Sequence, residues 1–283
     1  MTRAWSAGVV DFYTRHPISE SQVLAALRRR GKDPRRIAPA DLYEWDQDHY
    51  GGLAAVETLA RRAAIGRDSA VLDVCAGLGG PARFLADRFG ARVTGLDLTW
   101  PRCAGARRLS TAVGLGIRVR MVNADAQQMP FRARSFTAVV SQEGLLHVPD
   151  KAGTLAECAR VLVPGGRIAF TDWVATPRLG DDERHRLGEW MAAATLQSAD
   201  LYRAQLGEAG FVGVEAEDLS AEWAAILPAR LAMYRAMRDD MVVRFGQVWY
   251  DEYQQLSAFF VALVTAGKLG GGRFSGTAGP GAR

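Results

Sequence analysis

A short apolar run that leads directly into a glycine-rich turn constrains the fold of this chain more than any other segment. Residues 71–80 read Val-Leu-Asp-Val-Cys-Ala-Gly-Leu-Gly-Gly, and a helical pattern follows over residues 81–89. Glycines at the end of a strand let the backbone pass close to a ligand, and the first N–H groups of the next helix face that ligand. The segment therefore predicts a strand, a ligand-binding turn and a helix, in that order.

The alternation of strand and helix continues along the chain. Apolar runs and helical patterns follow one another at residues 92–98 (strand), 101–113 (helix), 118–122 and 136–141 (strands), 152–163 (helix) and 166–172 (strand). Strands separated by helices of this length predict a parallel sheet that is covered on both faces. Such sheets bind their ligands beyond the carboxyl ends of the strands.

Helical patterns dominate both ends of the chain. They cover residues 20–30 and 53–64 near the start, and residues 181–209 and 221–266 near the end. We expect Pro228 to break the last of these patterns, because proline removes a helical hydrogen bond. Residues 211–219 predict a strand, and residues 267–277 predict a weaker one because they are rich in glycine.

Composition limits the classes of function. Lys plus Arg number 35 and Asp plus Glu number 31 among 283 residues, so the net charge of +4 predicts no nucleic-acid partner. Cys75, Cys103 and Cys158 are far apart and lack metal-ligand spacing, which favours reduced thiols and no metal site. No apolar stretch is long enough to cross a bilayer. We expect a soluble, cytoplasmic monomer or homodimer without a membrane partner.

Acidic residues stand at the ends of three neighbouring strands. Asp73 precedes the glycines, where a carboxylate suits a ligand with positive charge and disfavours a pyrophosphate. Asp97 follows Gly77 by about twenty residues, the separation at which a carboxylate reaches both hydroxyls of a ribose. Asp125 lies in a loop that can accept a hydrogen bond from an adenine amino group. Each has a structural alternative: Asp73 as a buried carboxylate or helix cap, Asp97 and Asp125 as turn residues.

Taken together, these segments resemble the successive motifs of class I S-adenosylmethionine-dependent methyltransferases. The matching segments are residues 71–80, 95–97, 124–131, 135–141 and 160–166. Within that superfamily, residues 141–147 and 160–170 look most like the sarcosine/dimethylglycine N-methyltransferase and phosphoethanolamine methyltransferase group.

The resemblance implies an α/β fold with a Rossmann-like, doubly wound sheet of seven mostly parallel strands, N-terminal helices and a C-terminal helical lid. Residues 1–66 would form a helical cap with an active-site loop, and residues 67–180 the cofactor-binding core. Residues 181–283 would complete the sheet and supply the lid over the substrate.

The resemblance also implies the cofactor, S-adenosyl-L-methionine, which becomes S-adenosyl-L-homocysteine. Its methionine end would lie at Asp73 and the glycines, its ribose at Asp97 and its adenine at Asp125 and Ala126. The remaining residues expected beside the cofactor are Cys75, Gly77, Gly79, Leu98 and Gln142. Cys75 is a departure, because it stands where the family commonly has glycine.

Two residues after the fourth strand are catalytic candidates. Gln142 and His147 follow the strand at residues 136–141, where the family places its substrate. His147 suits a general base or a hydrogen bond to substrate, and its alternative is a packed or capping histidine ahead of Pro149. Trp173 stands at the carboxyl end of another strand and can face a cation or simply pack against the lid.

Residues 43–52 form the other unusual segment, because polar and aromatic residues alternate there without helical or strand periodicity. Such a stretch favours a loop that helps to form a pocket, with a surface turn as the alternative. We expect Tyr43, Gln47, His49 and Tyr50 to contact the ligands.

The leading hypothesis is an enzyme that moves a methyl group to a nitrogen, sulfur, oxygen or carbon atom of a small molecule by in-line displacement. A nicotinamide-dependent oxidoreductase is one alternative, but the chain lacks a clean GxGxxG and that function leaves Asp73 unexplained. A nucleic-acid methyltransferase is disfavoured by the charge balance. A non-catalytic S-adenosylmethionine-binding protein is the remaining alternative.

Overall fold

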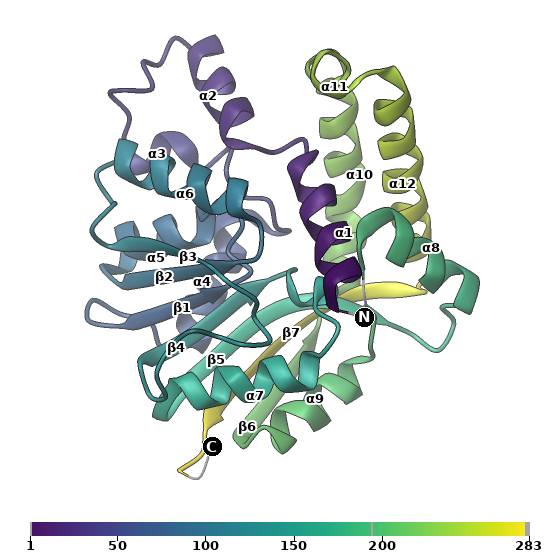
Figure 1. Ribbon diagram of the computed structural model, residues 1–283. Coiled ribbons are helices and arrows are strands. Elements are labelled where there is room, and N and C mark those ends of the chain that lie inside the picture. The colour runs from purple at the N-terminus through teal and green to yellow at the C-terminus, as the bar shows by residue number, and fades with distance from the viewer. Residues whose placement is uncertain (1, 194, 281–283) are drawn as a thin grey trace.

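The chain folds around one seven-stranded sheet with the strand order β3-β2-β1-β4-β5-β7-β6 (Figure 1). The computed structural model describes residues 2–193 and 195–280. The strands are β1 Ala70–Val74, β2 Arg92–Asp97, β3 Val119–Asn123, β4 Phe136–Gln142, β5 Leu162–Ala175, β6 Phe211–Asp218 and β7 Leu269–Ala278. The first five pair in parallel, and β7 runs antiparallel to both β5 and β6. The predicted mostly parallel sheet is confirmed.

Helices cover both faces of the sheet (Figure 1). Successive strand residues point to opposite faces, so Val71 packs against α4 (Gly52–Arg62) and α5 (Gly80–Phe89), and Leu72 packs in the other core cluster. That second cluster includes side chains of α7 (Lys151–Val161) and α9 (Ala199–Glu208). The helix α6 (Trp100–Ala112) packs beside β2 and β3. Strands buried on both faces explain the continuous apolar runs in the sequence.

Helices from both ends of the chain lie near the carboxyl ends of the central strands. Figure 1 shows α1, α10 and α12 side by side, next to the sheet. The helices outside the layers described above are α1 Thr2–Thr14, α2 Glu20–Arg29, α3 Pro39–Leu42, α8 Asp181–Met191, α10 Ser220–Ala236, α11 Arg238–Phe245 and α12 Gln247–Thr265. A short 3₁₀ turn, η1, lies at Leu145–His147. No helix in the described ranges combines the length and apolar character that crossing a membrane requires.

The prediction that Pro228 breaks a helix is wrong, because α10 continues through it. Trp223 and Leu227 are buried just before Pro228, where α10 packs on α12 and β7. This packing outweighs the cost of an internal proline, about 3 kcal/mol. The helical region breaks instead at Met237 and at Gly246, whose φ is +90°. Residues 181–209 likewise divide into α8 and α9, because Ala192 adopts the left-handed conformation after α8.

The glycine-rich strand β7 is a central strand of the sheet. A Cβ on Gly271 would lie 2.4 Å from the Trp223 ring, and a Cβ on Gly270 would lie 1.9 Å from Ser220 Oγ. The glycines therefore leave room for α10 to lie directly on the strand. This close approach places α10 over the end of the sheet where ligands bind.

Candidate functional site

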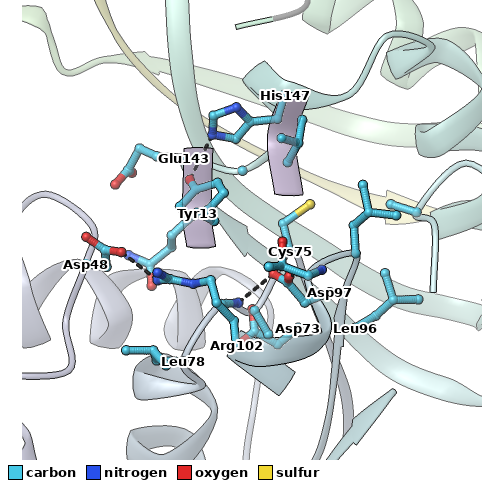
Figure 2. A pocket seen from close by; sticks show the side chains of 18 of the residues that line it. Tyr13, Asp48, Asp73, Cys75, Leu78, Leu96, Asp97, Arg102, Glu143 and His147 are labelled. Carbon is cyan, nitrogen blue, oxygen red and sulfur yellow. Dashed lines mark hydrogen bonds and ion pairs between the residues drawn. The ribbon is translucent and has the colours of Figure 1, made fainter. Parts of the chain in front are cut away.

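A cavity opens at the carboxyl ends of β1, β2 and β4, and α1 and residues 46–49 form its outer wall (Figure 2). The empty space between its lining residues, open solvent included, is about 890 Å³. The sequence-predicted residues that line this first cavity are His49, Asp73, Cys75, Gly77, Asp97, Leu98, Asp125, Ala126, Gln142 and His147. The fold thus brings together residues from five separate segments of the chain.

The turn between β1 and α5 forms the floor of the first cavity. Gly77 and Gly79 have φ values of +53° and +73°, which favour glycine. Gly79 itself does not line the cavity, because it precedes α5 and faces the Ala106 side chain. Cys75 also adopts a left-handed conformation, with φ of +60°, which suits glycine better than any residue with a side chain.

Asp73 is a buried carboxylate that lacks a complete set of partners. Its side chain is 2% exposed, and its Oδ2 has no hydrogen-bond partner within residues 2–193 and 195–280. Burial, and secondly the charge of Asp97, raise the pKa of Asp73 to about 8. A buried carboxylate of this kind is stabilised by a positively charged ligand, because such a ligand supplies the missing partner.

Asp97 connects the end of β2 to the glycine turn. Its Oδ2 accepts a hydrogen bond from the Gly77 N–H at 2.9 Å, and its Oδ1 accepts one from the Thr99 N–H at 2.8 Å. Burial raises the pKa of Asp97. Asp125, in the next loop, accepts hydrogen bonds from the backbone and side-chain N–H groups of Gln127. Both carboxylates are therefore fixed in orientation where they line the cavity.

His147 lies on η1, and α1 covers it. Its Nδ1 is 3.0 Å from the carbonyl oxygen of Ala192, and its Nε2 is 2.8 Å from the Tyr13 hydroxyl. A carbonyl oxygen only accepts, so Nδ1 carries the proton and Nε2 accepts a hydrogen bond from Tyr13. Burial lowers the pKa of His147 to about 4. The imidazole is therefore neutral near pH 7, with its unprotonated Nε2 facing Tyr13.

A hydrogen-bonded chain joins β4 to the loop before α4. Gln142 Nε2 lies 3.0 Å from His49 Nδ1, and His49 Nε2 donates to Gln47 Oε1 at 2.7 Å. The chain leaves Gln142 Oε1 buried and without a partner in the described part of the molecule. Gln47 thus supports His49 from behind and does not itself line the first cavity.

The prediction that Tyr43 contacts a ligand needs correction. Its ring packs edge-on against Phe84, and its hydroxyl donates to Asp87 Oδ2 at 2.6 Å, so it lies on α5 outside the cavity. A buried ion pair sets this course of the loop: Arg83 Nη2 lies 2.7 Å from Asp46 Oδ2. The pair holds residues 46–49 inward and leaves Tyr43 on the outer side of α5.

The sequence-based reasoning did not identify four further lining residues: Trp5, Tyr13, Asp48 and Arg102. Arg102 Nη2 lies 2.7 Å from Asp48 Oδ2, and its guanidinium lies 4.7 Å from the centre of the Tyr13 ring. Burial opposes the ionised form of Asp48, but His16, Arg102 and Arg230 together hold its pKa below the usual value. These residues come from distant segments, and no local motif marks them.

A second cavity, with about 720 Å³ of empty space, adjoins the first. Tyr13, Asp48, Glu143 and His147 line both cavities. Tyr50 and Trp173 line the second cavity and are absent from the wall of the first. With His147, three sequence-predicted residues therefore line this cavity, although the sequence did not separate it from the first.

Glu143 was also missed, although it stands next to Gln142. Its Oε2 accepts from the Tyr50 N–H at 2.8 Å, and its Oε1 accepts from the Thr171 hydroxyl at 2.5 Å. Burial raises its pKa to about 8. Its φ of +44° is unusual for a residue with a side chain, and it marks a constrained backbone where the two cavities meet.

Comparisons with known proteins agree with this architecture. A family model described as a methyltransferase domain matches residues 72–170. Methyltransferase GfsG of Streptomyces halstedii is 32% identical over 225 residues, which cover 77% of this chain and 80% of the relative.

A second relative is the glycine/sarcosine/dimethylglycine N-methyltransferase of Actinopolyspora halophila. It is 32% identical over 181 residues, but these cover 63% of this chain and only 32% of that longer protein.

The fold also resembles that of a solved methyltransferase. Phosphoethanolamine N-methyltransferase 2 of Haemonchus contortus, solved with phosphomonomethylethanolamine and S-adenosylhomocysteine, superposes with a TM-score of 0.75 at 21% identity. The superposition covers 96% of this chain and 60% of that one. The sheet order, the glycine turn with its acidic residues and the similarity to GfsG agree, and the chain belongs to the S-adenosylmethionine-dependent methyltransferases.

Proposed function

We propose that the first cavity binds S-adenosylmethionine with its amino-acid end at Asp73 and the glycine turn. The observation that carries this proposal is the buried Asp73 carboxylate, whose Oδ2 lacks a partner in the described residues. Gln142 Oε1 and Arg102 Nε are also buried there without partners in that part of the chain. Two acceptors and one cationic donor match the ammonium and carboxylate groups of an amino acid.

The rest of the cofactor follows the order of the strands. Asp97, with Leu98, would bind the ribose hydroxyls from the end of β2. Asp125 and Ala126 would bind the adenine from the loop after β3. Cys75 and Gly77 supply backbone that passes close to the ligand. Gly79 acts indirectly, because it starts α5 and so shapes the turn.

The bound cofactor supplies an electrophilic methyl group on a sulfonium sulfur. The chain positions a small-molecule acceptor in line with that group and removes the acceptor proton. His147 is the base that we propose, because its Nε2 is unprotonated and lies on the wall that both cavities share. Gln142 would hold the region between the cavities through His49 and would contact the cofactor with its free oxygen.

We also propose that three successive segments of the chain have different roles. Residues 1–66 form the cap and the active-site loop, and residues 67–180 hold the cofactor. Residues 181–283, of which 194 and 281–283 lie outside the described part, complete the sheet and enclose the acceptor. The free cysteines Cys75, Cys103 and Cys158 suit a cytoplasmic enzyme. We propose that it works as a monomer or homodimer on a metabolite.

Calorimetry with S-adenosylhomocysteine and, separately, with NADH tests the proposal. We expect saturable binding of S-adenosylhomocysteine and none of NADH, because a dinucleotide pyrophosphate would meet Asp73. Binding of NADH, or no binding of S-adenosylhomocysteine, would refute the assignment of the first cavity. Transfer of labelled methyl groups into a metabolite extract then separates an enzyme from a protein that only binds the cofactor.

A further inference from the structure

The second cavity carries information about the acceptor that the named relatives do not supply. It lies between α1, η1, α10 and α12, and it meets the first cavity at Tyr13, Asp48, Glu143 and His147. A methyl group held in the first cavity would therefore be presented at this shared wall. The inference below rests on the proposed function of the first cavity.

Apolar and aromatic side chains dominate the wall of the second cavity. Phe260 stacks on Trp173 with ring centroids 4.0 Å apart, and it lies nearly parallel to Tyr50 at 6.3 Å. Leu146, Leu227 and Leu231 also line this space. The empty space of about 720 Å³ among these residues includes open solvent. Apolar surface of a ligand is stabilised by burial against these walls.

The two carboxylates of this cavity are already engaged with the protein. Asp48 pairs with Arg102, and Glu143 accepts two hydrogen bonds from Thr171 and Tyr50. Arg230 Nη2 donates to the carbonyl oxygen of His49 at 2.6 Å, and Arg230 has no ion pair within the described residues. A zwitterion would therefore find a charged partner for its anionic group alone, which favours an uncharged acceptor.

One polar group of the second cavity remains free. Trp173 is 5% exposed, and its Nε1 has no hydrogen-bond acceptor among the residues that the structure describes. A buried N–H without a partner costs free energy unless a ligand supplies the acceptor. The ligand should therefore carry an oxygen for Trp173 in addition to its reacting atom.

We propose that the acceptor is an uncharged and largely apolar alcohol that occupies the second cavity. Its reacting hydroxyl lies at the shared wall, and a second oxygen accepts a hydrogen bond from Trp173 Nε1. The hydroxyl oxygen forms a bond to the methyl carbon while the bond from that carbon to sulfur breaks. The acceptor hydroxyl replaces the Tyr13 hydroxyl at His147 Nε2 and gives its proton to that nitrogen. The products are a methyl ether and S-adenosylhomocysteine.

Binding of Nile red, an uncharged apolar dye, tests whether the second cavity accepts an apolar ligand while saturating S-adenosylhomocysteine fills the first cavity. We expect the dye to bind, and farnesol, an apolar alcohol, to displace it, whereas sarcosine and phosphoethanolamine do not. The variant Leu231→Glu places a charge on the wall of the second cavity and should weaken dye binding about tenfold or more. Its calorimetric affinity for S-adenosylhomocysteine should stay within about twofold.

The matched control is Val243→Glu on α11, where the side chain is 86% exposed, and it should change neither affinity. The proposal is overturned if the dye fails to bind, or if Leu231→Glu binds it as the parent protein does. Methylation of sarcosine, glycine or phosphoethanolamine above the background without acceptor would also overturn it. Failure to bind S-adenosylhomocysteine would instead refute the proposed function of the first cavity.

Discussion

Asp73 is the residue whose ionisation should report cofactor binding. Burial raises its pKa to about 8, so the free protein holds a proton there at lower pH. A cationic ligand favours the carboxylate, so binding releases that proton and becomes tighter as the pH rises toward 8. Between about pH 6 and 7.5, affinity should increase by up to about tenfold per pH unit.

Calorimetry of S-adenosylhomocysteine binding at pH 6.5, in two buffers with different ionisation enthalpies, measures this proton release. Asp73→Asn should abolish the release and weaken binding about tenfold or more. Asp125→Asn serves as the control, because it should retain the release. Equal proton release by the parent protein and Asp73→Asn would show that another group titrates.

His147 and Tyr13 together decide how a proton leaves the acceptor. Removing a general base lowers turnover about 10²–10⁴-fold, so His147→Ala should lower kcat within that range. Its affinity for S-adenosylhomocysteine should remain close to that of the parent. Tyr13→Phe leaves the imidazole in place and should cost less turnover than His147→Ala. Single-turnover methyl transfer measures both variants, and full activity of His147→Ala would reduce His147 to a structural role.

The contrast between Asp73 and Arg102 shows what the sequence can predict at single residues. Asp73, Asp97 and Asp125 follow strands within recognisable motifs, so their common placement could be predicted. Arg102 and Asp48 meet only because α6 and the loop before α4 converge, and this depends on tertiary packing. Tyr43 was misplaced for the same reason, since the buried Asp46–Arg83 pair fixes the loop.

Among the elements, β7 and α10 depend on each other through their closest contacts. In Gly271→Ala the added Cβ would lie 2.4 Å from the Trp223 ring, which is too close for both to keep their positions. Overpacking of this kind costs about 1–3 kcal/mol, so the free energy of unfolding in urea should fall by that amount. Gly207→Ala on α9, where a Cβ would meet nothing within 4 Å, is the control and should be neutral or slightly stabilising. Equal stability of the two variants would contradict this account of β7.

Elements whose pattern is local were predicted nearly to their ends. The strand predicted ahead of the glycine-rich turn is β1, and the strand predicted at residues 92–98 is β2, one residue shorter. Pro228 misled the prediction, because contacts between α10, α12 and β7 override local propensity there. The strand predicted at residues 267–277 is confirmed as β7 despite its glycines. The break between α8 and α9 also escaped detection, since helical periodicity continues across it.

At the scale of the whole molecule, α1 contributes side chains to the walls of both cavities. It contributes Trp5 and Tyr13 to the first cavity, and Phe12 and Tyr13 to the second. Trp5 Nε1 donates to the carbonyl oxygen of His147, and Arg102 lies over the Tyr13 ring. Because α1 lies over both cavities, it should gain stability when a ligand fills the space beneath it.

S-adenosylhomocysteine at about 100 times its Kd should stabilise the fold by about 2.7 kcal/mol. For a chain of this size we expect the Tm to rise by roughly 5–10 °C, with slower amide hydrogen exchange in α1. The same concentration of NADH is the control and should leave both unchanged. Unaltered exchange in α1 despite a higher Tm would show that the helix does not respond to the cofactor.

The position of β7 between β5 and β6 also governs the order in which the molecule can be assembled. In the described sheet β6 has β7 as its neighbour, although residues 219–268 separate the two strands in the chain. A polypeptide emerging from the ribosome can therefore form the parallel half of the sheet early. Until β7 is synthesised, β6 lacks its neighbouring strand and α10 lacks the strand on which it packs. Until then α10 and α12 expose apolar surface to solvent, so the chain is most prone to aggregation during this interval.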